Sequence, residues 1–430
     1  MRAFRLSIAA GFVILAACSG SNTTPIVPIP TAAPVLQRGK IDALFKVGVL
    51  TKSTMTRGRG LQVASGLGGP PQCDVTLYSM VYETIGVHGE PAIASGAFYV
   101  PGAGCKGPFP IVGYAHGTIV VKRQSMTNAL STDPPGTLRD IESIFVAAIY
   151  AAHGYAAAAT DYLGFGLSTY PYHPYVHAES EASAVIDGIR AARNAAKRLH
   201  VPLSGRVFLN GYSQGGHSTL ATQRAIERDN PGEFDLRGVA PASGPYALNE
   251  WLHDRVAQNL PGASVLMAFT LPAYQKVYGD LYSSPSDVFQ EPYAKTIDTL
   301  LPLPTLADQA KLNQGALIPL DISKLLTPSF THDYLTNPSN EAAKRIYENA
   351  LLHGWSARAP LFFCGGKRDP SVPFKNSVEA YAYFKHHGRS VTLEDVDPYI
   401  PPGLKLTLYH DAVLLFCEPL ARKSFFDPRR

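Results

Sequence analysis

The stretch RVFLNGYSQGGHSTLATQRAIER (Arg206–Arg228) contains the pattern Gly-x-Ser-x-Gly, centred on Ser213. The pattern alone is weak evidence, because chains of this length produce it by chance. Here an apolar run that predicts a strand precedes it, and a segment that predicts a helix follows it from about Gly215 to Arg228. A strand, a tight turn and a helix in this order present the serine hydroxyl at the carboxyl edge of a sheet. Small residues at Gly211 and Gly215 fit such a turn, because a Cβ there would meet the flanking strand and helix.

The sequence on both sides of this stretch alternates apolar runs with helical patterns. Val75–Ile85 and Ala92–Pro101 flank a glycine-containing turn and predict a hairpin. Further strands are predicted at Phe109–Gly117, Tyr155–Tyr162, Leu236–Gly244, Ala359–Gly366 and Ser390–Asp397. Further helices are predicted at Thr137–Gly154, Ala178–Leu199, Lys375–His387 and Asp411–Phe426. The alternation indicates an α/β fold with a mostly parallel sheet covered by helices on both faces.

The alternation breaks between Pro245 and about Ser356, where aromatic residues and prolines are frequent. This segment predicts an inserted, mainly helical cap, whose aromatic side chains could form an acyl pocket or the core of the cap itself. The predicted organisation is a signal peptide (1–17), a tether and N-terminal segment (18–70), a first core part (71–244), the cap (245–356) and a second core part (357–430).

A serine hydroxyl is a poor nucleophile unless a histidine takes its proton and a carboxylate orients that histidine. In the order typical of this fold, the acid and then the base follow the serine. Asp369 follows an apolar strand, and His410 is expected just before the last helix. We therefore predict Ser213, Asp369 and His410 as a catalytic set.

Other acidic residues and histidines compete for these roles. Asp395 and Asp397 lie at the end of the last predicted strand, on the wrong strand for the usual order. His386 and His387 follow a helix, which indicates a surface position. His217 lies on the helix after the serine, where core packing or capping is the better interpretation.

Three further residues precede the serine. Asp161 is expected to bond to loop backbone. His173 and His177 have the spacing of a metal pair, but their segment contains Pro171 and Pro174 and no further acidic-histidine partner set. The predicted chemistry needs no metal.

A tetrahedral intermediate needs two backbone N–H donors. The residue after the nucleophile, Gln214, is predicted to supply one. The loop after the strand Phe109–Gly117 is predicted to supply the other from Thr118, with Gly117 allowing a tight turn.

The N-terminus predicts export. Arg2 and Arg5 precede an apolar run, Leu6–Ala17, that is too short to span a bilayer. The run ends in Leu-Ala-Ala-Cys18, which resembles the bacterial lipobox, although an ordinary cleavage site with an incidental cysteine fits too. A lipidated Cys18 would anchor the chain to a membrane, and the Ser/Thr/Pro-rich segment Ser19–Pro34 would act as a tether.

Four cysteines remain after Cys18, and export favours disulfide bonds between them. The predicted hairpin brings Cys73 and Cys105 to the same end, which leaves Cys364 and Cys417 as the second pair. Free buried thiols are the alternative.

The composition excludes some classes of function. The chain has 430 residues, of which 46% are hydrophobic and 17% charged, so it can bury a large core. Its formal net charge is +4, and cleavage before Cys18 would leave +2. This charge is too small to indicate nucleic-acid binding.

Several motifs together resemble the α/β-hydrolase superfamily and, within it, the secretory lipase family of fungal lipase A-like enzymes and bacterial exported lipases and esterases. The motifs are YAHGT (114–118), GYAAAATDYLGFG (154–166), RAARNA (190–195), NGYSQGGHS (210–218) and RDPSVP (368–373). The resemblance covers the chain from about Val75 to its end. It implies the Ser213, Asp369 and His410 triad, a helical cap between the sixth and seventh strands, ester substrates and no cofactor. One departure is the long segment PYIPPGLKLTLY (398–409) before His410, which weakens the assignment of the base.

The leading hypothesis is an exported serine esterase or lipase. A serine peptidase of the same fold would need a recess for the amino terminus of a peptide, and no spacing in the sequence indicates one. A non-catalytic, ligand-binding lipoprotein is a third reading, but such proteins usually lose a catalytic residue.

Overall fold

The computed structural model describes residues 36–130 and 138–430. The predicted signal peptide, the predicted tether Ser19–Pro34 and the candidate lipidation site Cys18 lie outside the described residues. The described chain clusters as one compact unit, Leu36–Arg430. No helix within it is long and apolar enough to cross a membrane.

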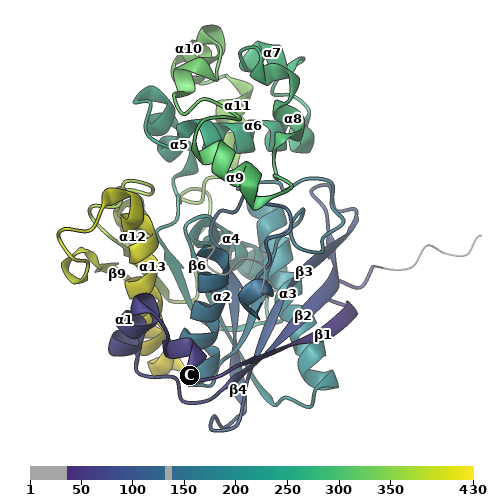
Figure 1. Ribbon diagram of the computed structural model, residues 1–430, viewed down its shortest axis with the longest axis vertical. Helices are drawn as coiled ribbons and strands as arrows, with labels where there is room; N and C mark the ends of the chain where they lie inside the picture. Colours follow the sequence, from purple (N-terminus) through teal and green to yellow (C-terminus); the bar gives the residue numbers. More distant parts are fainter. Residues whose placement is uncertain (1–35, 131–137) are drawn as a thin grey trace, which may run out of the picture. The chain divides into compact units, whose positions relative to one another are not determined.

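One nine-stranded sheet organises the described chain, in the order β1-β2-β3-β5-β4-β6-β7-β8-β9 (Figure 1). The first four strands of this order pair antiparallel, and every pairing from β5 to β9 is parallel. The strands are β1 (Ile41–Leu50), β2 (Val75–Ile85), β3 (Pro91–Pro101), β4 (Phe109–Ala115), β5 (Ala156–Thr160), β6 (Leu203–Tyr212), β7 (Asp235–Ala242), β8 (Leu361–Gly365) and β9 (Val391–Asp395). The predicted α/β class and mostly parallel sheet are confirmed.

Helices cover both faces of the sheet. On one face α3 (Ala178–Arg198), α4 (Gln214–Asp229) and α12 (Lys375–His386) pack in one apolar cluster. On the other face α1 (Arg59–Gly68), α2 (Leu138–Ile149) and α13 (Tyr409–Leu420) pack in a second cluster. The central strands β4, β5 and β8 are buried at every position, because a parallel strand between two helical layers has no solvent face.

The sequence analysis missed β1 and α1, which lie in the segment predicted as tether and N-terminal region. β1 pairs with β2 at the edge of the sheet, and its register shifts twice, between Ile41 and Ala43 and between Lys46 and Gly48. The shifts interrupt the alternation of apolar and polar residues, so the strand has no regular period of two. Residues 41–68 therefore contribute a strand and a helix to the core.

Two disulfide bonds have the predicted pairing. Cys73 and Cys105 join the chain ends on either side of the β2–β3 hairpin, with their Cα atoms 5.6 Å apart. Cys364 of β8 is bonded to Cys417 of α13, with a Cα separation of 5.7 Å. The second bond links the strand that precedes Asp369 to the helix that carries His410.

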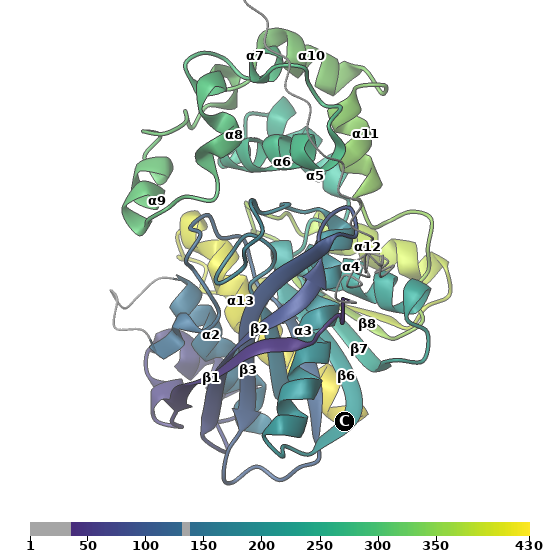
Figure 2. The ribbon, with the colours of Figure 1, turned by 90° about the vertical axis from the view of Figure 1, so that its right-hand side faces the viewer.

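Seven helices lie between β7 and β8, and Figures 1 and 2 both show them grouped together beyond one edge of the sheet. They are α5 (Leu248–Ala257), α6 (Ala263–Tyr278), α7 (Pro285–Val288), α8 (Ile297–Leu300), α9 (Leu306–Asn313), α10 (Pro328–Thr336) and α11 (Glu341–Glu348). The insertion follows the seventh strand rather than the sixth, because the unpredicted β1 shifts the count by one. These helices share a third apolar cluster.

Candidate active site

Ser213 lies on the sharp turn between β6 and α4. Its backbone has φ 61° and ψ −121°, a left-handed conformation that residues other than glycine rarely adopt. The neighbouring glycines permit close packing: a Cβ at Gly215 would lie 1.8 Å from the Ala115 carbonyl oxygen, and one at Gly211 would lie 2.5 Å from it. The turn therefore requires both glycines of the motif, as the sequence predicts.

His410 connects Ser213 to a carboxylate. Its Nε2 lies 2.9 Å from Ser213 Oγ, and its Nδ1 lies 2.7 Å from Asp369 Oδ2. The Asp369 side chain is fully buried, whereas that of His410 is 15% exposed. The helix α13 begins at Tyr409, not near Asp411 as predicted, so His410 lies in its first turn.

Backbone N–H groups hold the carboxylate of Asp369 in place. Its Oδ1 accepts hydrogen bonds from the N–H of Ser371 (2.9 Å) and of Val372 (3.1 Å). The other oxygen, Oδ2, faces His410. The loop after β8 thus fixes the orientation of the acid by its own backbone.

Tyr212, the residue before the serine, also contacts the histidine and was not predicted. Its hydroxyl donates a hydrogen bond to the His410 carbonyl oxygen, and the two rings lie 4.9 Å apart. Burial raises the pKa of Tyr212 well above its usual value, so the phenol remains a donor. The only sign of this role in the sequence is that Tyr212 is an aromatic residue inside the Gly-x-Ser-x-Gly pattern.

The loop after β4 carries the second predicted oxyanion donor, Thr118. The Gly117 N–H donates to Glu142 Oε1 (3.1 Å), and the Thr118 hydroxyl bonds to the Tyr175 hydroxyl (2.9 Å). Gly117 has no positive φ, and a Cβ there would lie 3.4 Å from the Tyr212 carbonyl oxygen, so the backbone at this position does not require glycine. Contacts with Glu142 and Tyr175, neither of them predicted, shape this loop instead.

Gln214 is the first residue of α4. The first N–H groups of a helix have no partner within the helix, and they form the positive end of the helix dipole. The first hydrogen bonds of α4 are those that the N–H groups of Gly216 and His217 donate to the Ser213 carbonyl oxygen. As the first residue of the helix, Gln214 has a backbone N–H that can donate a hydrogen bond to an anion next to Ser213.

A cavity of about 890 Å³ opens on Ser213 and His410. Its lining is largely apolar, and α1, α2 and α13 contribute to it together with the loops that precede α1, follow β4 and precede α13. The aliphatic lining residues are Leu61, Ile119, Ile144, Leu404, Leu408, Ala412, Leu414 and Leu415. Glu142 and Asp411 add two carboxyl groups, and burial raises the pKa of Asp411.

The aromatic residues between β7 and β8 do not form this cavity. From residues 245–356, all of which the structure describes, only Gln309 contributes to the lining. Trp251, Phe269, Tyr274 and Phe289 pack in the third apolar cluster instead. Of the two uses that the sequence left open for these side chains, the structure supports the core of the inserted segment.

The competing acidic residues are engaged elsewhere. Asp397 accepts hydrogen bonds from the Arg368 guanidinium (2.8 Å) and from the Tyr409 hydroxyl. Asp395 forms an ion pair with Lys367 (2.9 Å). Asp161 accepts from the Met126 N–H (2.7 Å), which confirms the expected bond to loop backbone.

The remaining histidines near the serine belong to buried polar contacts. His217 is fully buried, with Nδ1 facing Glu181 (3.3 Å) and Nε2 facing the Asn349 carbonyl oxygen (2.9 Å). His173 is also buried, and its Nδ1 lies 2.9 Å from the Leu163 carbonyl oxygen. Among residues 36–130 and 138–430, no group of three or more His, Cys, Asp or Glu side chains could hold a metal ion.

The chain is similar to known proteins in both sequence and fold. The chain matches the secretory lipase family over residues 130–398. The rice cell wall degrading esterase LipA from Xanthomonas oryzae is 33% identical, with a TM-score of 0.81 over 92% of this chain and 100% of that one. A putative hydrolase from Legionella pneumophila is 27% identical, with a TM-score of 0.76 over 90% and 98% of the two chains. No curated protein sequence matches the chain.

A more distant structure shares the fold alone. Candida antarctica lipase A in its closed state is 15% identical, with a TM-score of 0.60 over 85% of this chain and 78% of that one. Fold and comparisons together define an α/β hydrolase of the lipase and esterase class. Within that class the chain belongs to the secretory lipase family.

Proposed function

We propose that this protein is an exported carboxylic-ester hydrolase that works through an acyl-serine intermediate. The observation that carries the proposal is the continuous contact from Ser213 Oγ through His410 to Asp369, at 2.9 and 2.7 Å. In this geometry His410 can take the hydroxyl proton while Asp369 stabilises the imidazolium that results.

The reaction then has two halves. Ser213 Oγ attacks the ester carbonyl, and the N–H groups of Gln214 and Thr118 stabilise the oxyanion. His410 returns its proton to the alcohol that leaves. Water, activated by His410, attacks the acyl-serine and releases the carboxylic acid, which restores the enzyme.

The cavity beside Ser213 is proposed to hold the apolar part of the ester. Each methylene that leaves water for such a lining gains about 0.8 kcal/mol. Since α1 and α13 supply much of the lining, chain-length preference is set there. The helices of 245–356 act as a cap whose aromatic residues stabilise the cap itself.

Export and anchoring complete the proposal. Two disulfide bonds fit an oxidising compartment. Cleavage before Cys18 followed by its lipidation would tether the enzyme to a membrane. Mass spectrometry of the mature N-terminus tests this part, because a lipidated Cys18 adds the mass of its acyl groups.

Hydrolysis of a series of p-nitrophenyl esters tests the activity. Ser213→Ala is expected to lower kcat by at least about 10⁴-fold at every chain length. Ser243→Ala is the matched control, because Ser243 is a buried serine just beyond the neighbouring strand β7, and it should retain the wild-type rate. Equal, slow rates for wild type and Ser213→Ala would refute the proposal. A maximum at short acyl chains defines a carboxylesterase, and a maximum at long chains defines a lipase.

A further inference from the structure

A carboxylate that does not line the cavity is buried beside the first turn of α4. Glu181, in the first turn of α3, is 1% exposed. Its Oε1 accepts hydrogen bonds from the Val176 N–H (2.9 Å) and from the Gln214 side-chain amide (2.6 Å). Its Oε2 accepts from the Ser218 hydroxyl (2.6 Å) and faces His217 Nδ1 (3.3 Å). These contacts hold the pKa of Glu181 below its usual value despite the cost of burial.

Three of the four contacts come from one face of α4. Gln214, His217 and Ser218 are spaced three and four residues apart, so they project from the same side of the helix toward Glu181. The first turn of α4 is thus tied to a single carboxylate. This turn also carries Ser213 and the N–H group proposed to stabilise the oxyanion.

The Gln214 side chain is held from two directions. Besides Glu181, its amide Nε2 lies 2.8 Å from His173 Nε2. Burial lowers the pKa of His173 to about 4, so the ring is neutral. Its Nδ1 donates to the Leu163 carbonyl oxygen, which leaves Nε2 as an acceptor for Gln214. The two amide hydrogens of Gln214 therefore have separate, buried acceptors.

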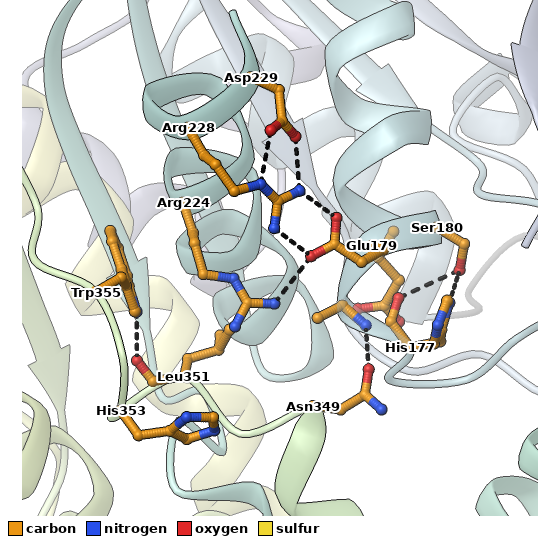
Figure 3. A network of polar contacts seen from close by, with 12 residues as sticks. His177, Glu179, Ser180, Arg224, Arg228, Asp229, Asn349, Leu351, His353 and Trp355 are labelled. Carbon is orange, nitrogen blue, oxygen red and sulfur yellow. Dashed lines mark hydrogen bonds and ion pairs between the residues drawn. The ribbon is translucent and has the colours of Figure 1, made fainter. Parts of the chain in front are cut away.

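Glu181 differs in its burial and in its partners from Glu179, two residues earlier on the same helix. Figure 3 shows Glu179 turned toward Arg224 and Arg228, with which it forms ion pairs of 3.2 and 2.7 Å. The side chain of Glu179 is 47% exposed. In the same view Asn349 lies at the start of α3, where its side-chain oxygen accepts from the Ala178 N–H (2.8 Å).

His217 is the fourth partner of Glu181. Its Nδ1 faces Glu181, and its Nε2 faces the Asn349 carbonyl oxygen, so the ring joins the carboxylate to the segment that follows α11.

We infer that Glu181 is a positioning residue for the oxyanion hole: by holding the Gln214 side chain, it fixes the direction of the Gln214 backbone N–H beside Ser213. The inference rests on the proposed function. Ser213 has a strained backbone, and such a conformation persists only where the surroundings hold it in place. A donor aimed at the oxyanion acts fully only when it is placed within about 0.5 Å.

The test uses Glu181→Ala, Glu181→Gln and Gln214→Ala in the full-length protein, with kcat and KM measured on one p-nitrophenyl ester. Glu181→Ala and Gln214→Ala should each lower kcat about 10- to 100-fold with little change in KM, because the loss arises in the transition state. The inhibition constant of a boronic acid, which forms a tetrahedral adduct with serine, should rise by a similar factor. Glu181→Gln retains an acceptor for Gln214 and should keep most of the activity. The double variant Glu181→Ala/Gln214→Ala should be no slower than either single variant.

Asp187→Asn is the matched control. Asp187 is another fully buried carboxylate of α3, but it pairs with Arg38 and Arg190 away from Ser213. This variant should lose stability and keep the kcat of wild type. The inference is overturned if Gln214→Ala keeps wild-type kcat and boronate affinity while its melting temperature falls, if Glu181→Gln loses as much kcat as Gln214→Ala should, or if the losses in the double variant add. If Glu181→Ala does not fold, the other two variants still decide. Failure of the proposed function would differ, because Ser213→Ala would then hydrolyse esters as wild type does.

Discussion

Two histidine–carboxylate pairs flank Ser213, and they differ in what surrounds them. The front pair, His410 and Asp369, opens on the cavity, and its histidine is 15% exposed. The back pair, His217 and Glu181, is sealed between α3, α4 and Asn349, with both side chains at most 1% exposed. A histidine therefore meets a carboxylate twice near this turn, once at the cavity and once in the buried core.

The difference shows that access, not composition, separates a reacting pair from a structural one. A proton can pass from Ser213 only to a histidine whose free nitrogen faces the hydroxyl, as Nε2 of His410 does at 2.9 Å. Both nitrogens of His217 already have acceptors, so it has no nitrogen available for Ser213. The back pair instead stabilises the turn on which the front pair depends.

The largest expected effect is at the front histidine. His410→Ala should lower kcat by about 10⁴- to 10⁶-fold, because the serine loses its base. The melting temperature should change little, since His410 lies at the edge of the cavity. Ester hydrolysis and thermal unfolding measure the two effects. His386→Ala is the control at an exposed helix end, and loss of activity only in that variant would show that the base is misassigned.

Substitution of the back histidine should lower stability more than activity. His217→Leu removes one hydrogen-bond partner of the buried Glu181 carboxylate, and it should lower the free energy of unfolding by about 1–3 kcal/mol. The kcat of the folded fraction should fall less than tenfold, because Glu181 still binds Gln214. Urea unfolding together with active-site titration checks both. If His217→Leu had normal stability but no activity, the back pair would not be a structural pair and the distinction from the front pair would be wrong.

Acid should destabilise the region around the back pair. Burial lowers the pKa of His173 and of His177 to about 4, so in the folded state both bind protons more weakly than in the unfolded state. Unfolding then takes up protons between pH 6.5 and about 4, and stability falls as the pH decreases through that range. Each histidine should contribute about 1.4 kcal/mol per pH unit. Urea unfolding at pH 7, 6 and 5 measures this slope, and His177→Asn should make it less steep; equal slopes would contradict the assignment.

The smallest effect is expected at Tyr212. Tyr212→Phe removes the hydrogen bond to the His410 carbonyl oxygen but keeps the ring contact. The loss of one such bond costs about 1 kcal/mol, which corresponds to about a fivefold decrease in kcat if it acts fully on the position of His410. Steady-state kinetics check the value. A decrease as large as that of His410→Ala would mean that Tyr212 has a direct chemical role.

Much of the core could be predicted from local patterns. The run RVFLN lies within β6, and the predicted hairpin corresponds to β2 and β3. Both disulfide bonds follow from that hairpin. β1 was not predictable in the same way, because its two register shifts remove the regular alternation that marks a strand.

The first turn of α13 shows a second limit. His410 was expected before the helix, but the helix begins at Tyr409. The boundaries of a helix are set by contacts that propensity does not encode, here including the bond between Tyr212 and His410. His410 could be predicted as the candidate base, whereas its position in the first turn of α13 could not.

The sequence by itself determined the α/β class, the family resemblance and the candidates Ser213, Asp369 and His410, because a strand–turn–helix around serine and a fixed chain order are local features. Only the tertiary structure decided which residues line the cavity and which histidine faces the serine. It also revealed Glu181 and Tyr212, which lie 32 residues and one residue before Ser213 in the chain. Contacts of this kind depend on how helices pack across a sheet, and the hydrophobic period of each helix specifies its buried face but not the partner that it meets.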